Sequence, residues 1–128
     1  MNILIEKKKL NTYKDLIAWQ KSYELCLLVF KAAKLLPREE QFGLSAQLKR
    51  SALSIPSNIA EGYTRQSTQD YLRFLYIAYA SLAELETQLL LTQDLNYINQ
   101  NTFSNLINLQ KEVQRIMFRL IQSLKQKT

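Results

Sequence analysis

The sequence contains no histidine, only two glycines and two prolines, and a single cysteine. Without histidine, the chain lacks the side chain that most often serves as a general base near neutral pH. One cysteine excludes an internal disulfide and is typical of a protein in a reducing compartment. The scarcity of glycine and proline leaves little material for β-turns, so it favours helices joined by short connections.

No catalytic or metal-binding motif compensates for the missing histidine. The sequence has no Walker loop, no dinucleotide fingerprint and no Cys/His metal spacing. Cys26 falls on the apolar side of a predicted helix, which favours a buried structural thiol over a nucleophile. Glu84 and Glu86 are two positions apart and therefore diverge on a helix. We expect a protein that is not an enzyme, with no cofactor and no resident metal.

The chain also lacks the signals of a membrane or secreted protein. No apolar run approaches the roughly 20 residues that a membrane-spanning helix needs. The first ten residues place apolar side chains before lysines, the reverse of a secretory signal. We therefore expect a cytoplasmic protein with no membrane partner. Its net charge is +6, from 17 lysines and arginines against 11 acidic residues, and this excess favours polyanionic partners.

The hydrophobic pattern predicts a single helical domain over residues 12–128, after a basic, flexible leader at 1–11. The expected helices span about residues 13–35, 37–62, 68–94 and 103–125. Because the connections are short, neighbouring helices should be antiparallel. The predicted fold is therefore all-α, an antiparallel up-down four-helix bundle.

Capping residues predict where three of these helices begin. Thr12 with Asp15 and Ser67 with Asp70 match the capping-box pattern before the first and third helices. Thr102 is the expected cap of the fourth helix. The first helix is expected to bury one stripe, formed by Leu16, Trp19, Tyr23, Cys26, Phe30 and Ala33.

The second helix holds the unusual residues of the chain. Pro37 suits its first turn, where acidic neighbours complement the helix dipole. Pro56 lies within it and is expected to kink it, because proline lacks the N–H that a helix interior requires. Gly62 is expected to stop it.

The third helix is apolar around most of its circumference. Beyond its core face it carries Leu72, Tyr76 and Tyr79, and Leu53 likewise lies off the core stripe of the second helix. A helix that is apolar nearly all round is buried on more than one side. We therefore expect a homo-oligomer whose interface includes these four residues. The alternative is that splayed helices and the leader cover them.

A polar ridge follows the second helix at steps of three or four residues. It consists of Gln47, Arg50, Ser54, Asn58, Glu61 and Arg65. One interpretation is a phosphate-binding surface that uses Arg50 and Arg65, and another is a polar site around Glu61. The third is a structural network in which Glu61 pairs with an arginine and Asn58 satisfies backbone that Pro56 opens. The structural network is favoured.

A basic strip, Lys111, Arg115 and Arg119, follows the fourth helix at steps of four, opposite its apolar stripe. Such side chains supply most sequence-independent affinity for nucleic acid. The alternative is a solvent-exposed face whose cations interact favourably with the negative, C-terminal end of the helix dipole. The seven tyrosines could stack on unpaired bases, although core or interface positions are the alternative for each. No RNA-recognition motif, zinc finger or KH loop is present, so we expect no sequence-specific readout.

Three segments carry a family resemblance. These are DLIAWQKSYEL at 15–25, FGLSAQLKRSALSIPSNIAEGYTR at 42–65 and YLRFLYIAYASLAELETQL at 71–89. Over about residues 12–95 the chain resembles the bacterial four-helix-bundle proteins encoded in intervening sequences of 23S ribosomal RNA genes, and the likeness is weak in the last helix. The resemblance implies a ring-like homopentamer. It also implies kinship with the accessory variability proteins of diversity-generating retroelements, which bind nucleic acid and a reverse transcriptase.

Two functions follow as hypotheses. The first is a basic homo-oligomeric scaffold that binds RNA or DNA through backbone phosphates, using Lys111, Arg115, Arg119, Arg50 and Arg65. The second is a protein–protein adaptor that docks a reverse transcriptase or another enzyme, with exposed aromatic anchors and binding that survives salt. The sequence does not separate them.

Overall fold

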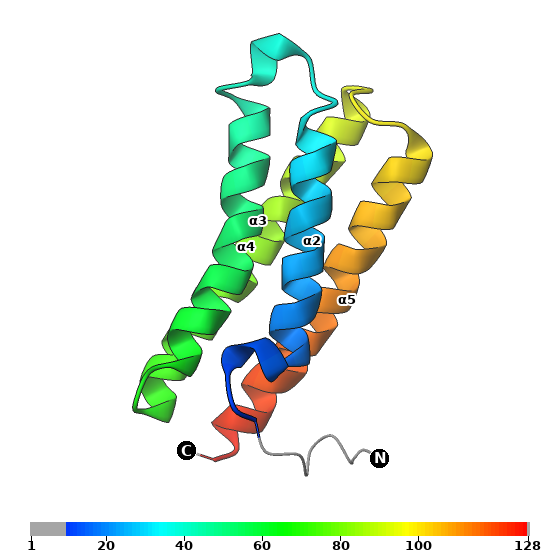
Figure 1. Cartoon of the computed structure of the whole chain (residues 1–128). Helices are drawn as coiled ribbons and strands as arrows, with labels where there is room; N and C mark the ends of the chain where they lie inside the picture. Colours follow the sequence, from blue (N-terminus) through cyan, green and yellow to red (C-terminus); the bar gives the residue numbers. More distant parts are fainter. Residues whose placement is uncertain (1–9, 128) are drawn as a thin grey trace.

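The computed structural model describes residues 10–127, and these form four long α-helices and no strand (Figure 1). In chain order the elements are η1 (Tyr13–Asp15), α2 (Ile17–Ala33), η2 (Arg38–Glu40), α3 (Leu44–Tyr63), α4 (Thr68–Asp94) and α5 (Gln100–Lys125). The prediction of an all-α fold with four helices is confirmed. Most of the leader predicted at 1–11 lies outside the described residues.

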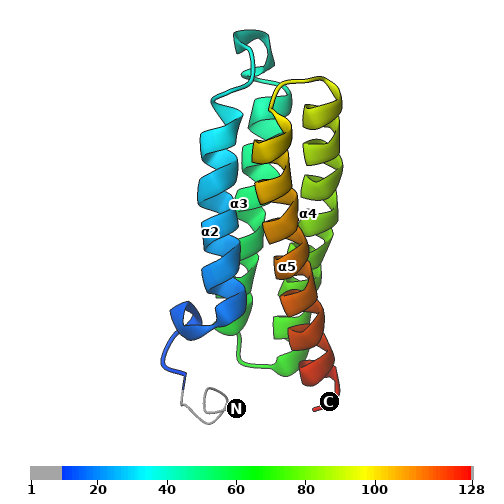
Figure 2. The same cartoon turned by 90° about the vertical axis from the view of Figure 1, so that its right-hand side faces the viewer.

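Each helix packs against its two neighbours in the order α2, α3, α4, α5, and α5 closes the set against α2. The helices α3 and α5 are therefore diagonal. Figures 1 and 2 show that the α2–α3 and α4–α5 connections lie at one end of the molecule, and the α3–α4 connection at the other. Within the described chain, no helix is both long and apolar enough to cross a membrane.

The first predicted helix is divided into two elements. The capping box is present: Thr12 Oγ1 accepts a hydrogen bond from the Lys14 amide, and the Asp15 carboxylate accepts one from the Thr12 amide. It caps the short 3-10 helix η1, however. Leu16 then adopts an extended conformation, with φ −77° and ψ 130°, so α2 starts only at Ile17 and ends at Ala33.

The buried face of α2 is rotated from the predicted stripe. Tyr23 is 48% exposed and Phe30 is 37% exposed, so neither is a core residue. Leu25 and Val29 are fully buried in their place. The predicted stripe is therefore confirmed in part: Cys26 and Ala33 are buried and Leu16 and Trp19 pack against the core, whereas Tyr23 and Phe30 were wrongly included. Small residues of α2, such as the buried Ser22, lie on the core side of the helix.

The second predicted helix starts later and ends later than expected. Pro37 is extended, with ψ 157°, so residues 38–40 form only the 3-10 helix η2, and α3 begins at Leu44. Gly43 is the N-cap residue of α3, and Glu40 supplies the side-chain acceptor, since its Oε1 accepts a hydrogen bond from the Leu44 amide at 3.1 Å. Its other carboxylate oxygen accepts one from Tyr97 Oη at 2.9 Å, which ties the α2–α3 connection to the α4–α5 connection.

Gly62 does not stop α3, which continues through it to Tyr63. Gly62 is buried, and a Cβ at this position would lie 2.8 Å from Phe74 Cβ and 3.2 Å from the Tyr71 carbonyl oxygen. A glycine is required here because α4 approaches the α3 backbone, not because the helix ends. The helix is also continuous through Pro56.

The ends of the last two helices follow the capping rules, with one correction. The predicted bounds of α4, 68–94, are confirmed, and Ser67 Oγ accepts a hydrogen bond from the Asp70 amide at 3.1 Å. Thr102 was wrongly expected to cap α5. Asn99 is the cap, because its side-chain oxygen accepts a hydrogen bond from the Thr102 amide at 2.7 Å.

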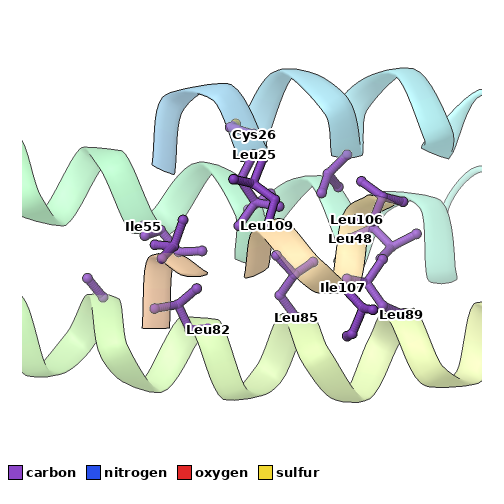
Figure 3. Packing of buried hydrophobic residues seen from close by; sticks show 14 of the residues in the cluster. Leu25, Cys26, Leu48, Ile55, Leu82, Leu85, Leu89, Leu106, Ile107 and Leu109 are labelled. Carbon is purple, nitrogen blue, oxygen red and sulfur yellow. The ribbon is translucent and has the colours of Figure 1, made fainter. Parts of the chain in front are cut away.

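The core contains aliphatic side chains from all four α-helices, among them Leu25, Leu48, Leu82 and Leu109 (Figure 3). The polar side chain of Gln110 is fully enclosed with them, and its Nε2 donates a hydrogen bond to the Leu82 carbonyl at 3.0 Å.

Two further polar contacts form a seam between α3 and α4. Ser51 Oγ donates a hydrogen bond to Gln88 Oε1 at 2.7 Å. One turn along, Ser81 Oγ donates one to Ser54 Oγ at 2.8 Å. The contact between these two helices is therefore partly polar, although Ser51 and Ser81 are themselves buried.

Candidate nucleic-acid interface

The basic strip of α5 lies on the surface, as its spacing predicts. Lys111, Arg115 and Arg119 are all exposed and follow one another at single-turn steps. The stripe on the opposite side of α5 buries Leu109 and Val113 in the core. The three cations therefore share one side of the bundle, on a helix whose orientation is fixed by its packing.

The strip borders an open groove of about 450 Å³ between α4 and α5. The groove is lined by Tyr79, Lys111, Gln114, Arg115, Phe118 and Arg119, and we call it the basic–aromatic groove. It combines three cationic side chains with two aromatic rings and one amide. The helices α4 and α5 are neighbours in the bundle (Figure 2); α4 contributes Tyr79 to the groove, and α5 contributes the other five lining residues.

The cations of the groove differ in their protein contacts. Lys111 Nζ lies 3.6 Å from Glu86 Oε2 of α4. Among the described residues, neither Arg115 nor Arg119 has an acidic side chain within ion-pair distance. Two guanidinium groups are thus left with their donors directed to solvent or to a ligand. Planar guanidinium forks match the geometry of phosphate oxygens.

The arginines of the polar ridge are placed differently. Arg65 Nη2 lies 2.9 Å from Glu61 Oε2, and its guanidinium carbon lies 4.6 Å from the ring centroid of Phe74. The pairing of Glu61 with an arginine, expected from the sequence, is present. Arg65 follows the C-cap of α3, in the α3–α4 connection, whereas Arg50 is exposed on α3 itself. Neither arginine lines the basic–aromatic groove, and α3, which carries Arg50, is diagonal to α5.

Asn58 has a structural contact, but not the expected one. The carbonyl that Pro56 leaves without a helical donor is that of Ala52, four residues earlier. Asn58 Nδ2 instead donates hydrogen bonds to the carbonyl oxygen of Ser54 at 2.8 Å and to its Oγ at 3.0 Å. Asn58 therefore extends the α3–α4 seam, since the Ser54 hydroxyl also contacts Ser81.

Comparison with known proteins gives the context of this arrangement. Residues 14–119 match the family described as 23S rRNA-intervening sequence protein. The chain belongs to this family. The match extends past the region of the strongest resemblance and includes all three residues of the basic strip. A comparison with curated proteins found no match.

A solved structure supports the assignment of this 23S rRNA-intervening sequence protein. It is the 1.70 Å crystal structure of a protein of unknown function from the S23 ribosomal protein family of Bacteroides thetaiotaomicron VPI-5482. The two chains are 29% identical and superimpose with a TM-score of 0.77. The similarity covers 82% of this chain and 98% of that chain.

The present chain exposes apolar side chains at positions that the sequence predicts to form the oligomer interface. Leu53 and Tyr76 are about half exposed, and Leu72 is half-buried. Leu72 and Tyr76 line a shallow depression of about 800 Å³ on α4, together with Ile77. Tyr79, the fourth predicted interface residue, lines the basic–aromatic groove instead.

Sequence reasoning missed Phe118, which is 50% exposed on the wall of the groove. The available signal was its position within the basic strip, three residues after Arg115 and away from the apolar stripe.

Burial raises the pKa of the Cys26 thiol, and Cys26 is enclosed in the core. Within residues 10–127 no three acidic, cysteine or histidine side chains cluster as metal ligands would.

Proposed function

We propose that this 23S rRNA-intervening sequence protein is a cytoplasmic, non-enzymatic scaffold that binds nucleic acid through backbone phosphates. The observation that carries the proposal is the pair of exposed arginines, Arg115 and Arg119, that line the groove with no acidic partner among the described residues. Lys111 adds a third charge at the same groove. Arg50 and Arg65 take a smaller part, because Arg50 lies on the diagonal helix and Arg65, in the α3–α4 connection, is already paired.

We further propose that the chain is an antiparallel up-down bundle that assembles into a ring-like homopentamer. The apolar surface around Leu53, Leu72 and Tyr76 supports self-association, since side chains of this kind are depleted on the free surface of a monomer. The number of subunits is taken from the family resemblance. Five copies of a chain of charge +6 would carry +30, which strengthens long-range attraction to a polyanion.

The test replaces the basic strip and measures the salt dependence of RNA binding. In the variant K111Q/R115Q/R119Q, three phosphate contacts are removed. The slope of log affinity against log salt should therefore fall by about 2 for single-stranded RNA. Fluorescence anisotropy with a labelled oligonucleotide, across a salt series at constant pH, gives both the affinity and the slope.

A matched control separates local contacts from net charge. The variant K31Q/K34Q/R38Q removes the same number of charges from exposed positions at the other end of the bundle. We expect it to retain most of the affinity and nearly all of the slope. Equal losses in the two variants, or unchanged binding in the strip variant, would show that the strip is not the binding surface.

One observation favours a second candidate, the protein–protein adaptor that docks a reverse transcriptase or another enzyme. Phe42, in the connection between η2 and α3, is 89% exposed and lies away from the basic–aromatic groove. An aromatic side chain in this position suits an anchor for a protein partner. Binding to a partner that survives high salt and is lost in Phe42→Ala would support this function.

A further inference from the structure

The aromatic side chains of the groove are not explained by phosphate binding. A surface that recognises only phosphates needs cations and N–H donors, and an exposed ring adds nothing to that contact. Phe118 is nevertheless half exposed between Arg115 and Arg119. Nor does the fold require it, because the neighbouring Met117 fills the core at that level of α5.

The geometry of the groove places a second ring within reach of the same ligand. Tyr79 lines the groove from α4, whereas Phe118 lines it from α5. Gln114 lies between the cations on α5 and offers both a donor and an acceptor. A concave site lined by two aromatic rings and two guanidinium groups suits a flat, polar ring joined to a phosphate.

We propose that the basic–aromatic groove binds single-stranded nucleic acid, stacking an unpaired base on Phe118 and Tyr79 while Arg115 and Arg119 hold the adjoining phosphates. In a duplex the bases are paired and stacked on one another, so only the phosphates would reach the groove. In a single strand the base is free to turn into it, and stacking on aromatic side chains tolerates any base. This inference rests on the proposed phosphate-binding function and adds a preference among nucleic acids.

The experiment compares probes that share phosphates but differ in their bases. The probes are a labelled oligoadenylate RNA, a DNA strand of the same length and sequence, an abasic DNA strand of that length, and a duplex. The wild-type protein should bind both base-bearing single strands at least about fivefold more tightly than the abasic strand, given the worth of one stacked base. The RNA and DNA strands show whether the sugar matters.

Substitutions of the ring then test its role. Phe118→Leu should move the affinity for the base-bearing strands toward that for the abasic strand, with the remainder due to Tyr79, and should leave abasic and duplex binding unchanged. Phe118→Trp should preserve the preference, because it keeps an aromatic face. Phe42→Leu removes an exposed ring outside the groove and should have no effect. Light scattering should give the same mass for all variants.

The outcomes distinguish this inference from the function on which it rests. If the wild type binds all probes with equal affinity and K111Q/R115Q/R119Q weakens them equally, phosphate binding stands and base stacking is wrong. If no probe binds at low salt, both are wrong. If Phe118→Leu instead lowers the mass of the assembly without a selective effect on base-bearing strands, the groove is a contact between copies of the chain, and the inference is overturned.

Discussion

The polar ridge of α3 and the basic strip of α5 are built from similar residues at similar spacing, yet they differ in their contacts. On the ridge, Arg65 is paired with Glu61, and Asn58 donates to Ser54. On the strip, Arg115 and Arg119 line a groove without an acidic partner among the described residues. A surface whose polar groups are satisfied internally stabilises the fold, whereas one whose donors are unpaired is available to a ligand.

The comparison teaches that charge and spacing do not assign a role by themselves. Both surfaces carry arginines at helical steps, and a helical wheel treats them alike. The difference comes from the neighbouring helix: α4 presents a buried seam to α3 and an open groove to α5.

Disrupting the close packing of α4 against Gly62 should lower the free energy of unfolding and leave RNA binding unchanged. In Gly62→Ala the new methyl group would lie 2.8 Å from Phe74 Cβ, so α3 and α4 must separate slightly. We expect the free energy of unfolding to fall by about 1–3 kcal/mol, as for other overpacked sites. Urea unfolding followed by circular dichroism measures this loss.

A control substitution identifies the cause of that loss. Ser57→Ala lies on the exposed side of the same helix and should change the free energy of unfolding by less than about 0.5 kcal/mol. The affinity of folded Gly62→Ala for RNA should equal that of the wild type, because the strip lies on the diagonal helix. Weakened RNA binding by fully folded protein would contradict the division between ridge and strip.

A smaller effect is expected at Tyr71, which packs against Gly62 and Tyr63. Burial, with a contribution from Tyr63, raises the pKa of Tyr71 to about 12. Because the folded-state pKa lies above the ordinary value of 10, the folded protein retains its proton where the unfolded chain loses it. The contribution of Tyr71 to stability is therefore complete below pH 10 and is lost between about pH 10 and 12.

The variant Tyr71→Phe measures this contribution directly. It removes a hydroxyl that is enclosed without a hydrogen-bond partner, so its stability at neutral pH should equal or exceed that of the wild type. Between pH 10 and 12 its stability should decline less steeply than that of the wild type, since other groups titrate alike in both. Parallel declines, measured by urea unfolding at each pH, would show that Tyr71 does not titrate across this range.

The smallest effects should come from single arginines. Arg65→Gln breaks an exposed ion pair and should cost less than about 1 kcal/mol of stability. Arg115→Gln has no such pair to break, yet it should reduce the salt slope of RNA binding by about 0.7, whereas Arg65→Gln should reduce it less. A larger change in slope for Arg65→Gln would reverse the roles of the two surfaces.

Much of the fold could be predicted from the sequence, because hydrophobic periodicity and capping are local. The bounds of α4 follow from Ser67 and from the apolar pattern. The errors arose where local rules compete. Pro37 is compatible with the first turn of a helix but is extended here, and Gly62 matches a helix end but accommodates a neighbouring helix.

The candidate site was predicted only in part. The basic strip could be predicted from the spacing of four residues between its cations alone. Its groove could not be predicted, since Tyr79 and Phe118 come from different helices and meet only through tertiary packing. The same limit applies to Asn58. Its hydrogen-bond partner Ser54 is near in sequence, but its place in the α3–α4 seam depends on the contact of Ser54 with Ser81 on the other helix.

The α3–α4 seam has a consequence for assembly. A leucine-rich contact tolerates sliding, because one aliphatic side chain replaces another after a helical turn of about 5.4 Å. A shift of that size would separate Ser51 from Gln88 and Ser54 from Ser81, so that the two buried hydroxyls would keep only the carbonyl acceptors of their own helices. The seam thus fixes the height of α3 relative to α4. Leu53 and Tyr76, which lie on these two helices, are therefore held at one vertical offset. If the chain self-associates as proposed, every copy would present the same outer profile to its neighbour.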